Sequence, residues 1–132
     1  MVKRGPNDRP RPTDAELAIL RVLWRLGPST VREVQEVLEA EKPTGYTTVL
    51  KFMQIMIEKG LLDRDKSQRS HVYRPCVPAE KTRRQLVGDL LERAFEGSAE
   101  QLVVQALSAR KVSPDELAKI RALLDEMEGE KS

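Results

Sequence analysis

The stretch of sequence that decides the fold is PTGYTTVLKFMQIMIEKG, residues 43–60. Two turn-forming residues, Pro43 and Gly45, are followed by a cluster of hydroxyl side chains, an apolar run and Lys51. The apolar residues recur at helical spacing until Gly60 ends the pattern. The inner face consists of Val49, Leu50, Met53, Met56 and Ile57. This pattern predicts a helix whose first turns carry more hydrogen-bonding side chains than a packed core needs.

Two further helices are predicted upstream of this stretch. Thr13 and Glu16 have the spacing of a capping box, and the apolar face behind them predicts a largely buried helix over residues 14–26. Ser29 or Thr30 is expected to cap a second helix. The residues expected on its inner side are Val31, Val34 and Leu38. The acidic residues expected largely on its solvated side are Glu33, which also completes the capping box, Glu36 and Glu39.

Two short strands are predicted directly after the third helix. Residues 61–65 and 70–75 have strand character, and residues 66–69 between them are polar and basic, as the tip of a hairpin should be. Three helices followed by a β-hairpin describe a winged helix-turn-helix. Residues 30–59 form its two-helix element, and residues 61–75 form its wing.

Helices also dominate the predicted C-terminal region. Residues 79–95 have a helical pattern, Ser98 can cap the next helix, and Ser113-Pro114 is a typical start for a third. Helices of about fifty residues in total are too few for a good independent core, so their apolar stripes are expected to bury against a second copy of the chain. The residues predicted for dimerisation are Leu86, Leu90, Leu102, Val103, Leu107, Leu117, Ile120, Leu124 and Met127. The alternative is a monomer in which they pack back onto the winged helix.

The expected fold class is therefore mainly α, with an N-terminal winged helix-turn-helix and a C-terminal helical dimerisation domain. Residues 1–12 are expected to be a flexible basic arm, residues 13–77 the DNA-binding domain, and residues 78–132 the dimerisation domain. The arm is interpreted as a solvated terminus, with a reach into phosphates or a minor groove as the alternative.

The third helix is the predicted recognition helix. A helix that enters the major groove of double-stranded DNA needs side chains near its N-terminus that reach base edges or phosphates. The candidates are Thr44, Tyr46, Thr47, Thr48 and Lys51, with helix capping as the alternative role of Thr44. On the wing, contacts with phosphates are predicted for Arg64, Lys66, Arg69 and Arg74. His71 is expected to be a strand residue, without the role of a ligand or a base.

The composition argues against several other classes of protein. One His and one Cys cannot supply a catalytic set or a metal site, so neither an enzyme nor a cofactor is expected. No stretch approaches the ~20 apolar residues of a membrane span, and the start of the chain is basic without the apolar run of a secretory signal. A cytoplasmic protein without membrane insertion is therefore expected. The first 79 residues hold 14 basic and 10 acidic side chains, which fits a module that binds a polyanion.

Several segments resemble the penicillinase-repressor family, the BlaI/MecI-type regulators that also include copper-responsive members. They are LAILRVLW (17–24), YTTVLKFMQIMIEKGLL (46–62) and HVYRP (71–75), and the likeness covers roughly residues 13–127. The resemblance implies a homodimeric transcriptional repressor of the kind that regulates antibiotic resistance. Its winged helices would occupy the half-sites of a palindromic operator. It also implies release by an inducing signal: a membrane-bound sensor protease triggers cleavage in the C-terminal domain, near Gln105 and Ala106 in this chain.

Three departures from the family pattern bear on function. The staphylococcal type of relative has Asn-Phe at the cleaved bond, where this chain has Gln105-Ala106. Copper-responsive members carry a C-terminal cluster of cysteines, which Cys76 alone cannot form. Phe52 and Ile55 stand where relatives usually have polar residues. These two residues are expected to contact the first helix, the arm or thymine methyl groups. They also suit the alternative function, a protein-interaction adaptor that does not bind DNA sequence-specifically.

Overall fold

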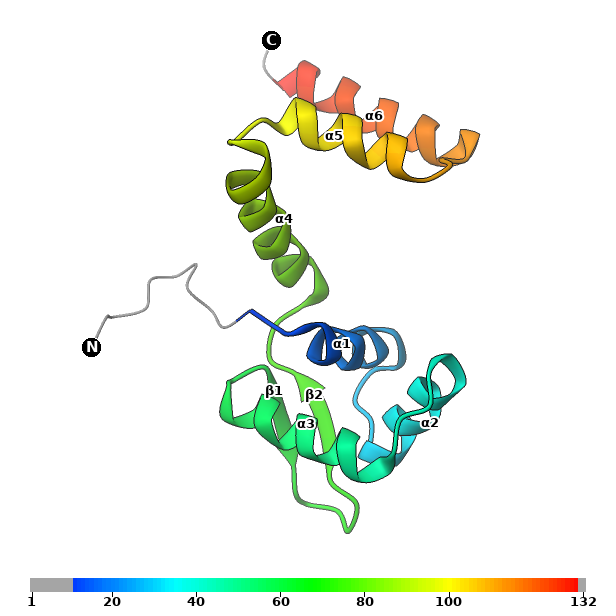
Figure 1. The fold of residues 1–132 in the computed structure, drawn as a ribbon, viewed down its shortest axis with the longest axis vertical. Coiled ribbons are helices and arrows are strands. Elements are labelled where there is room, and N and C mark those ends of the chain that lie inside the picture. Colours follow the sequence, from blue (N-terminus) through cyan, green and yellow to red (C-terminus); the bar gives the residue numbers. More distant parts are fainter. Residues whose placement is uncertain (1–10, 131–132) are drawn as a thin grey trace, which may run out of the picture. The chain divides into compact units, whose positions relative to one another are not determined.

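The structure is a computed structural model that describes residues 11–130. Figure 1 shows its elements in chain order: α1 (Asp14–Leu26), α2 (Val31–Glu41), α3 (Tyr46–Glu58), β1 (Leu62–Asp65), β2 (Val72–Pro75), α4 (Ala79–Phe95), α5 (Ala99–Ala109) and α6 (Pro114–Glu130). The predicted mainly α architecture, three helices and a hairpin followed by further helices, is confirmed. The chain divides into two compact units, one up to Val87 and the other from Gly88 on.

The helix starts of the first unit follow the local sequence closely. The side chains of Thr13 and Thr30 each accept a hydrogen bond from the backbone N–H of the residue three positions on, Glu16 and Glu33. Each glutamate in turn accepts from the backbone N–H of its cap residue, so both capping boxes are complete. Gly27 ends α1 with φ at +88°, a conformation that favours glycine. The caps predicted for these two helices are therefore confirmed.

The core of the first unit lies between α1, α2, α3 and the base of the hairpin. Its buried members are Ile19, Leu20, Val22, Leu23, Val31, Val34, Leu38, Val49, Met53, Met56, Leu61, Leu62 and Tyr73. Burial of each large side chain contributes about 1.5–3 kcal/mol, so these residues supply most of the driving force for folding. Because the core takes one face from each helix, the opposite face of α3 is left toward solvent.

The hairpin is fastened to the helices at its base. β1 and β2 pair antiparallel, with Arg64 opposite Tyr73 and Asp63 opposite Arg74. Tyr73 also exchanges two backbone hydrogen bonds with Ser29, at 3.0 Å and 2.8 Å, and thereby joins β2 to the turn between α1 and α2. The strands begin one and two residues later than predicted, and His71 lies just before β2, so its expected place in a strand was wrong.

One ion pair lies inside the first unit. The Lys59 ammonium, at the end of α3, donates to Glu16 Oε1 on α1 at 2.7 Å, and the Glu16 side chain is only 3% exposed. Burial raises the pKa of Glu16, but hydrogen bonds from Lys59 and the Thr13 backbone outweigh it and hold the pKa below its ordinary value. The folded state therefore favours the ionised form. The ionised Glu16 carboxylate therefore contributes its full stabilisation above pH 4.5, the ordinary pKa of a glutamate. This stabilisation is lost as the pH falls through the lower pKa that Glu16 has in the folded protein.

The substitution Glu16→Gln is expected to lower the free energy of unfolding by about 1–2 kcal/mol near neutral pH. Glutamine keeps an acceptor for the Thr13 N–H but removes the charge that Lys59 faces. Urea unfolding followed by circular dichroism measures the difference, which should shrink when Glu16 of the parent protein is protonated in acid. Asp14→Asn, an exposed carboxylate in the same turn, is the matched control. If both substitutions lowered the free energy of unfolding equally at all pH values, the stabilising role of the ion pair between Lys59 and Glu16 would be contradicted.

The start of α4 is attached to α1. The Trp24 indole Nε1–H donates to the Val77 carbonyl at 3.2 Å, and the Arg83 guanidinium lies 5.9 Å from the centroid of the Trp24 ring. Thr82 is buried. The first compact unit accordingly extends to Val87, beyond residue 77, where the sequence places the domain boundary. That boundary stays a prediction.

The second unit has well-formed helix starts but no interior. Ser98 caps α5 by accepting from the Gln101 N–H, and Ser113 accepts from the Glu116 N–H at the start of α6. Both caps agree with the prediction. No residue of α5 or α6 within the described chain is buried, and the two helices barely touch each other.

Two expectations concern segments at or beyond the ends of the structure. Most of the expected basic arm, residues 1–12, lies outside the described residues. Across residues 11–130, none of the helices combines the length and the apolar character needed to cross a membrane.

Candidate DNA-binding surface

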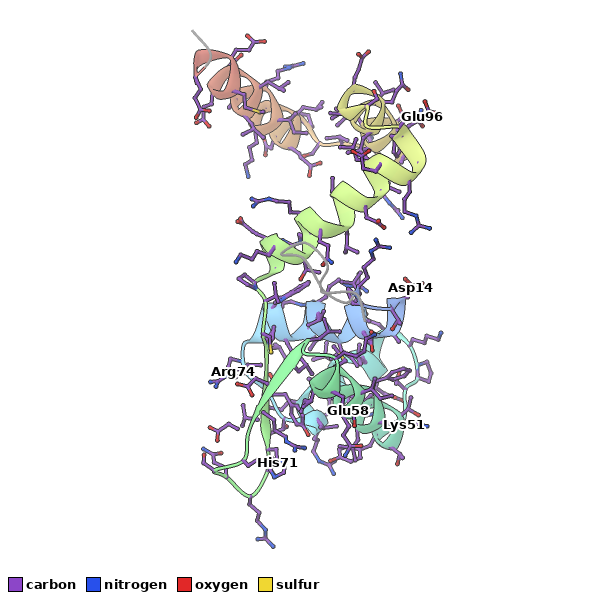
Figure 2. All side chains as sticks on the ribbon, turned by 90° about the vertical axis from the view of Figure 1, so that its left-hand side faces the viewer. Asp14, Lys51, Glu58, His71, Arg74 and Glu96 are labelled. Carbon is purple, nitrogen blue, oxygen red and sulfur yellow. The ribbon has the colours of Figure 1, made fainter. Side chains whose placement is uncertain are left out.

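The outer face of α3 carries exposed polar side chains. Tyr46, Thr47, Thr48 and Lys51 are all exposed, whereas Val49, Met53 and Met56 on the inner face are buried. Thr47 and Lys51 are four residues apart and therefore lie on the same side of the helix. Figure 2 shows Lys51 on α3. The four α3 residues predicted to contact DNA are thus at the surface, and the contact itself stays a prediction.

Thr44 does not cap α3, so the predicted capping role was wrong. The N-cap is Gly45, which makes no side-chain hydrogen bond to the helix. The Thr44 hydroxyl instead donates to the Lys42 carbonyl at 2.8 Å, and because the N-cap position falls on Gly45, Thr44 stands one residue too early to cap α3. Thr44 is partly exposed, and its DNA contact remains a prediction.

The exposed side of α3 continues beyond the residues that the sequence singled out. Gln54 and Glu58 follow Thr47 at seven and eleven positions and are exposed. Figure 2 shows Lys51 and Glu58 along the same helix. The helical spacing from Thr47 could have identified Gln54, whose amide can pair with the edge of an adenine. A small pocket lined by Gln54, Ile57, Glu58 and Arg64 lies between this face and β1.

Phe52 and Ile55 have different environments. Phe52 is partly buried and packs against the hydrophobic core, whereas Ile55 is 37% exposed. Packing within the chain therefore accounts for Phe52 but not for Ile55. A protein-interaction surface on α3 would have Ile55 as its apolar anchor, which is a small area for a stable interface.

The tip of the wing carries two exposed cations. Lys66 and Arg69 both lie between β1 and β2 and are exposed. Asp65 shapes the turn by accepting the Ser67 N–H at 2.8 Å, and this hydrogen bond lowers the pKa of the Asp65 carboxyl. The tip thus holds Lys66 and Arg69 outward, where a phosphate backbone could meet them.

The other two wing arginines have partners or neighbours within the hairpin. Arg74 makes an exposed ion pair with Asp63 at 3.2 Å. The backbone N–H of Arg64 and the Arg74 guanidinium both lower the pKa of Asp63. Arg64 is half-buried beside the pocket, and its Nε has no hydrogen-bond partner. Lys66 and Arg69 are therefore better placed than Arg64 and Arg74 for a first contact with phosphates.

Neither the single cysteine nor the single histidine lies in a metal-binding cluster. Cys76 is exposed and follows β2, and His71 is partly buried near the hairpin tip. Over the residues that the structure describes, no three His, Cys, Asp or Glu side chains come together in a way that could hold a metal ion.

The chain from Leu86 on exposes the apolar side chains predicted for dimerisation, all but Leu86 of them in the second unit. Leu90, Val103, Leu107, Leu124 and Met127 are exposed large hydrophobic residues, and Leu86, Leu102, Leu117 and Ile120 are partly exposed. The structure adds Val87, Val104 and Leu123, which the predicted stripes missed because the exposed faces are wider than one row of residues. Exposed apolar side chains in this number are typical of an interaction site, and the dimerisation role of these residues stays a prediction.

Comparison with known proteins identifies one family of repressors throughout. Residues 12–126 match the family model of the penicillinase repressor. Among curated proteins, the transcriptional regulator BlaI of Mycobacterium tuberculosis (strain H37Rv) is 33% identical over 116 residues, covering 87% of this chain and 83% of that protein. The penicillinase repressor of Bacillus licheniformis is 25% identical over 92% of this chain and 95% of its own length. The methicillin resistance regulatory protein MecI of Staphylococcus aureus (strain N315) is 19% identical over 86% of this chain and 92% of its own length.

A solved structure agrees with this family assignment. The solution structure of the DNA binding domain of the repressor BlaI matches 55% of this chain and 89% of its own length, with a TM-score of 0.50 and 27% sequence identity. This likeness to a DNA-binding domain supports the assignment of a winged helix-turn-helix.

Proposed function

Since the chain belongs to the penicillinase-repressor family of transcriptional regulators, we propose that it represses transcription by binding a palindromic operator as a homodimer. The bound dimer blocks access to the promoter, and no chemical reaction is needed. The observation that carries the proposal is the outer face of α3, where Tyr46, Thr47, Thr48 and Lys51 are exposed together. Hydroxyls and a cation at the start of a helix suit base edges and phosphates in a major groove.

The wing supplements this face. Lys66 and Arg69 project from the hairpin tip, and cations there add affinity for phosphates without reading sequence. In this arrangement α3 supplies specificity and the wing supplies part of the affinity.

The homodimer is supported by the second unit. Its helices bury none of their described residues in the single chain and expose leucine, valine and methionine side chains. A second copy offers the same apolar faces, so a self-complementary interface buries both. Linking two DNA-binding units in this way raises the affinity for a palindrome through the effective concentration of the second unit.

Release of the operator is proposed to follow loss of the dimer. Cleavage near Gln105 and Ala106, triggered by a membrane-bound sensor protease, would divide α5 (Ala99–Ala109) close to its centre. Both residues are exposed but helical, so a protease must first open that part of α5. Because α5 buries none of its residues within its own chain, little packing inside the chain opposes such opening.

Salt-dependent binding to duplex DNA tests this function. If Lys51, Lys66 and Arg69 of each protomer meet phosphates, about six contacts predict a slope of roughly −5 in log affinity against log salt, or about a thousandfold loss between 50 and 200 mM. Gel shifts with the full chain and a pool of duplexes measure this loss. Absence of binding at low salt would refute the repressor and favour the protein-interaction adaptor.

A further inference from the structure

A polar row on α2 reaches the start of α3. Arg32, Gln35 and Glu39 follow each other at three and four positions and so lie along one side of α2. Glu39 is exposed, as predicted, and its Oε2 accepts the Thr44 N–H at 2.7 Å. Gln35 Nε2 donates to the Thr44 carbonyl at 3.0 Å and to Glu39 Oε2 at 3.4 Å. The Arg32 guanidinium lies 5.6 Å from the centroid of the Tyr46 ring.

These contacts hold the turn that leads into α3, a helix without a side-chain cap. Gly45 offers no capping side chain, and the Thr44 hydroxyl is bound to the Lys42 carbonyl. Both backbone groups of Thr44 are instead held by α2, so the last peptide groups before α3 are fixed to the neighbouring helix. Two polar side chains that bind the N–H and the C=O of one residue restrict the translation and the rotation of the segment that follows.

We propose that Gln35 and Glu39 are positioning residues that set where the N-terminus of α3 stands relative to α2, and thereby aim Thr47 and Lys51 at the DNA. Contacts with base edges tolerate displacements of only about 0.5 Å, so a looser turn weakens binding although neither residue touches DNA. This inference rests on the proposed function, because it assigns a role in DNA binding.

The charge of Glu39 makes the idea sharply testable. A carboxylate near a DNA-binding surface repels phosphates, so its removal should strengthen binding if it acts only as a charge. If Glu39 instead positions α3, removal of its acceptor weakens binding. Glutamine at the same place separates the two effects, because its amide oxygen still accepts the Thr44 N–H without the negative charge.

The experiment compares Glu39→Ala, Glu39→Gln and the control Glu36→Ala, an exposed carboxylate on the same helix. Fluorescence anisotropy of full-length chains on a duplex selected by the parent protein gives the affinities. Glu39→Ala is expected to bind about tenfold more weakly, the product of a roughly threefold loss in each protomer. Glu39→Gln and Glu36→Ala should bind at least as tightly as the parent. Circular dichroism melting verifies that all chains are folded.

The possible outcomes separate the inference from the function on which it rests. If Glu39→Ala binds like Glu36→Ala, Glu39 is only a surface charge and the positioning role is overturned, while the parent protein still binds its duplex. If the parent itself shows no selective binding, the proposed function fails first.

A second readout does not depend on DNA. The Thr44 amide proton, followed by NMR, should exchange slowly in the parent and in Glu39→Gln but faster in Glu39→Ala. In the separate DNA-binding assay, Gln35→Ala should weaken binding in the same direction as Glu39→Ala. Slow exchange in Glu39→Ala would show that the turn does not need the carboxylate and would also overturn the proposal.

Discussion

Replacement of Leu117, Ile120 and Leu124 by Asp will convert the protein to a monomer and abolish tight operator binding. These residues form one stripe on α6, a helix that buries none of its residues in the single chain. Burial of each large apolar side chain contributes about 1.5–3 kcal/mol to an interface, and a carboxylate in its place must lose its hydration without a partner. Each substitution therefore acts on both sides of a self-complementary interface.

The effect on DNA binding should be larger than any single contact could produce. In a dimer, binding of one unit to its half-site holds the second unit at a high effective concentration near the other half-site. A monomer lacks this effect, which raises the affinity by about a hundredfold to ten-thousandfold. Sedimentation equilibrium measures the mass, and anisotropy measures binding to the selected duplex. The first unit should keep its fold, because α6 contributes nothing to its core.

A control with the same change of charge keeps this result interpretable. Lys119→Asp, Ala122→Asp and Glu126→Asp lie on the opposite side of α6 and also shift the net charge by three units. That protein should remain a dimer and bind DNA. A persisting dimer in the chain with Asp at 117, 120 and 124 would place the interface elsewhere.

Alanine at Lys51 or Thr47 should weaken operator binding and leave the dimer intact. Both side chains are exposed on the outer face of α3, so neither contributes to the core. Loss of a contact worth about 1–2 kcal/mol counts twice in a dimer and gives roughly a 30-fold to 1000-fold loss of affinity. Lys111→Ala removes an exposed cation from the second unit and serves as the matched control for Lys51→Ala.

The dependence on salt shows what Lys51 touches. If Lys51 meets a phosphate, Lys51→Ala should reduce the salt slope by about one for each protomer and weaken binding equally on all sequences. If it meets a base, the slope stays and discrimination at one position of each half-site is lost. Unchanged affinity of both Lys51→Ala and Thr47→Ala would remove the assignment of α3 as the recognition helix.

Features that depend on local sequence were the most predictable. The capping box at Thr13 and the cap at Ser98 connect residues three positions apart, so the spacing identifies them, and for the second helix it narrowed the cap to Ser29 or Thr30, of which the structure has Thr30. The helices over 14–26 and 79–95 have the predicted bounds for the same reason. The apolar periodicity of α3 likewise separated its buried from its exposed side.

Features that depend on distant partners were not predictable. The ion pair between Lys59 and Glu16 joins residues 43 positions apart, and nothing in either neighbourhood indicates it. The pairing of Tyr73 with Ser29 joins β2 to a turn 44 residues earlier, which the sequence of the hairpin does not indicate. The residue type of Thr44 suggested helix capping as its alternative role. In the structure its backbone N–H and C=O instead form hydrogen bonds with Glu39 and Gln35.

Selection of duplexes from a random-sequence library by the full chain tests the central claim most directly. The account predicts that repeated rounds enrich an inverted repeat, with half-sites related by the two-fold symmetry of the dimer and their centres separated by whole turns of the duplex. Enrichment of a single unrepeated site, or of no sequence at all, would contradict a dimeric repressor that reads its operator with α3.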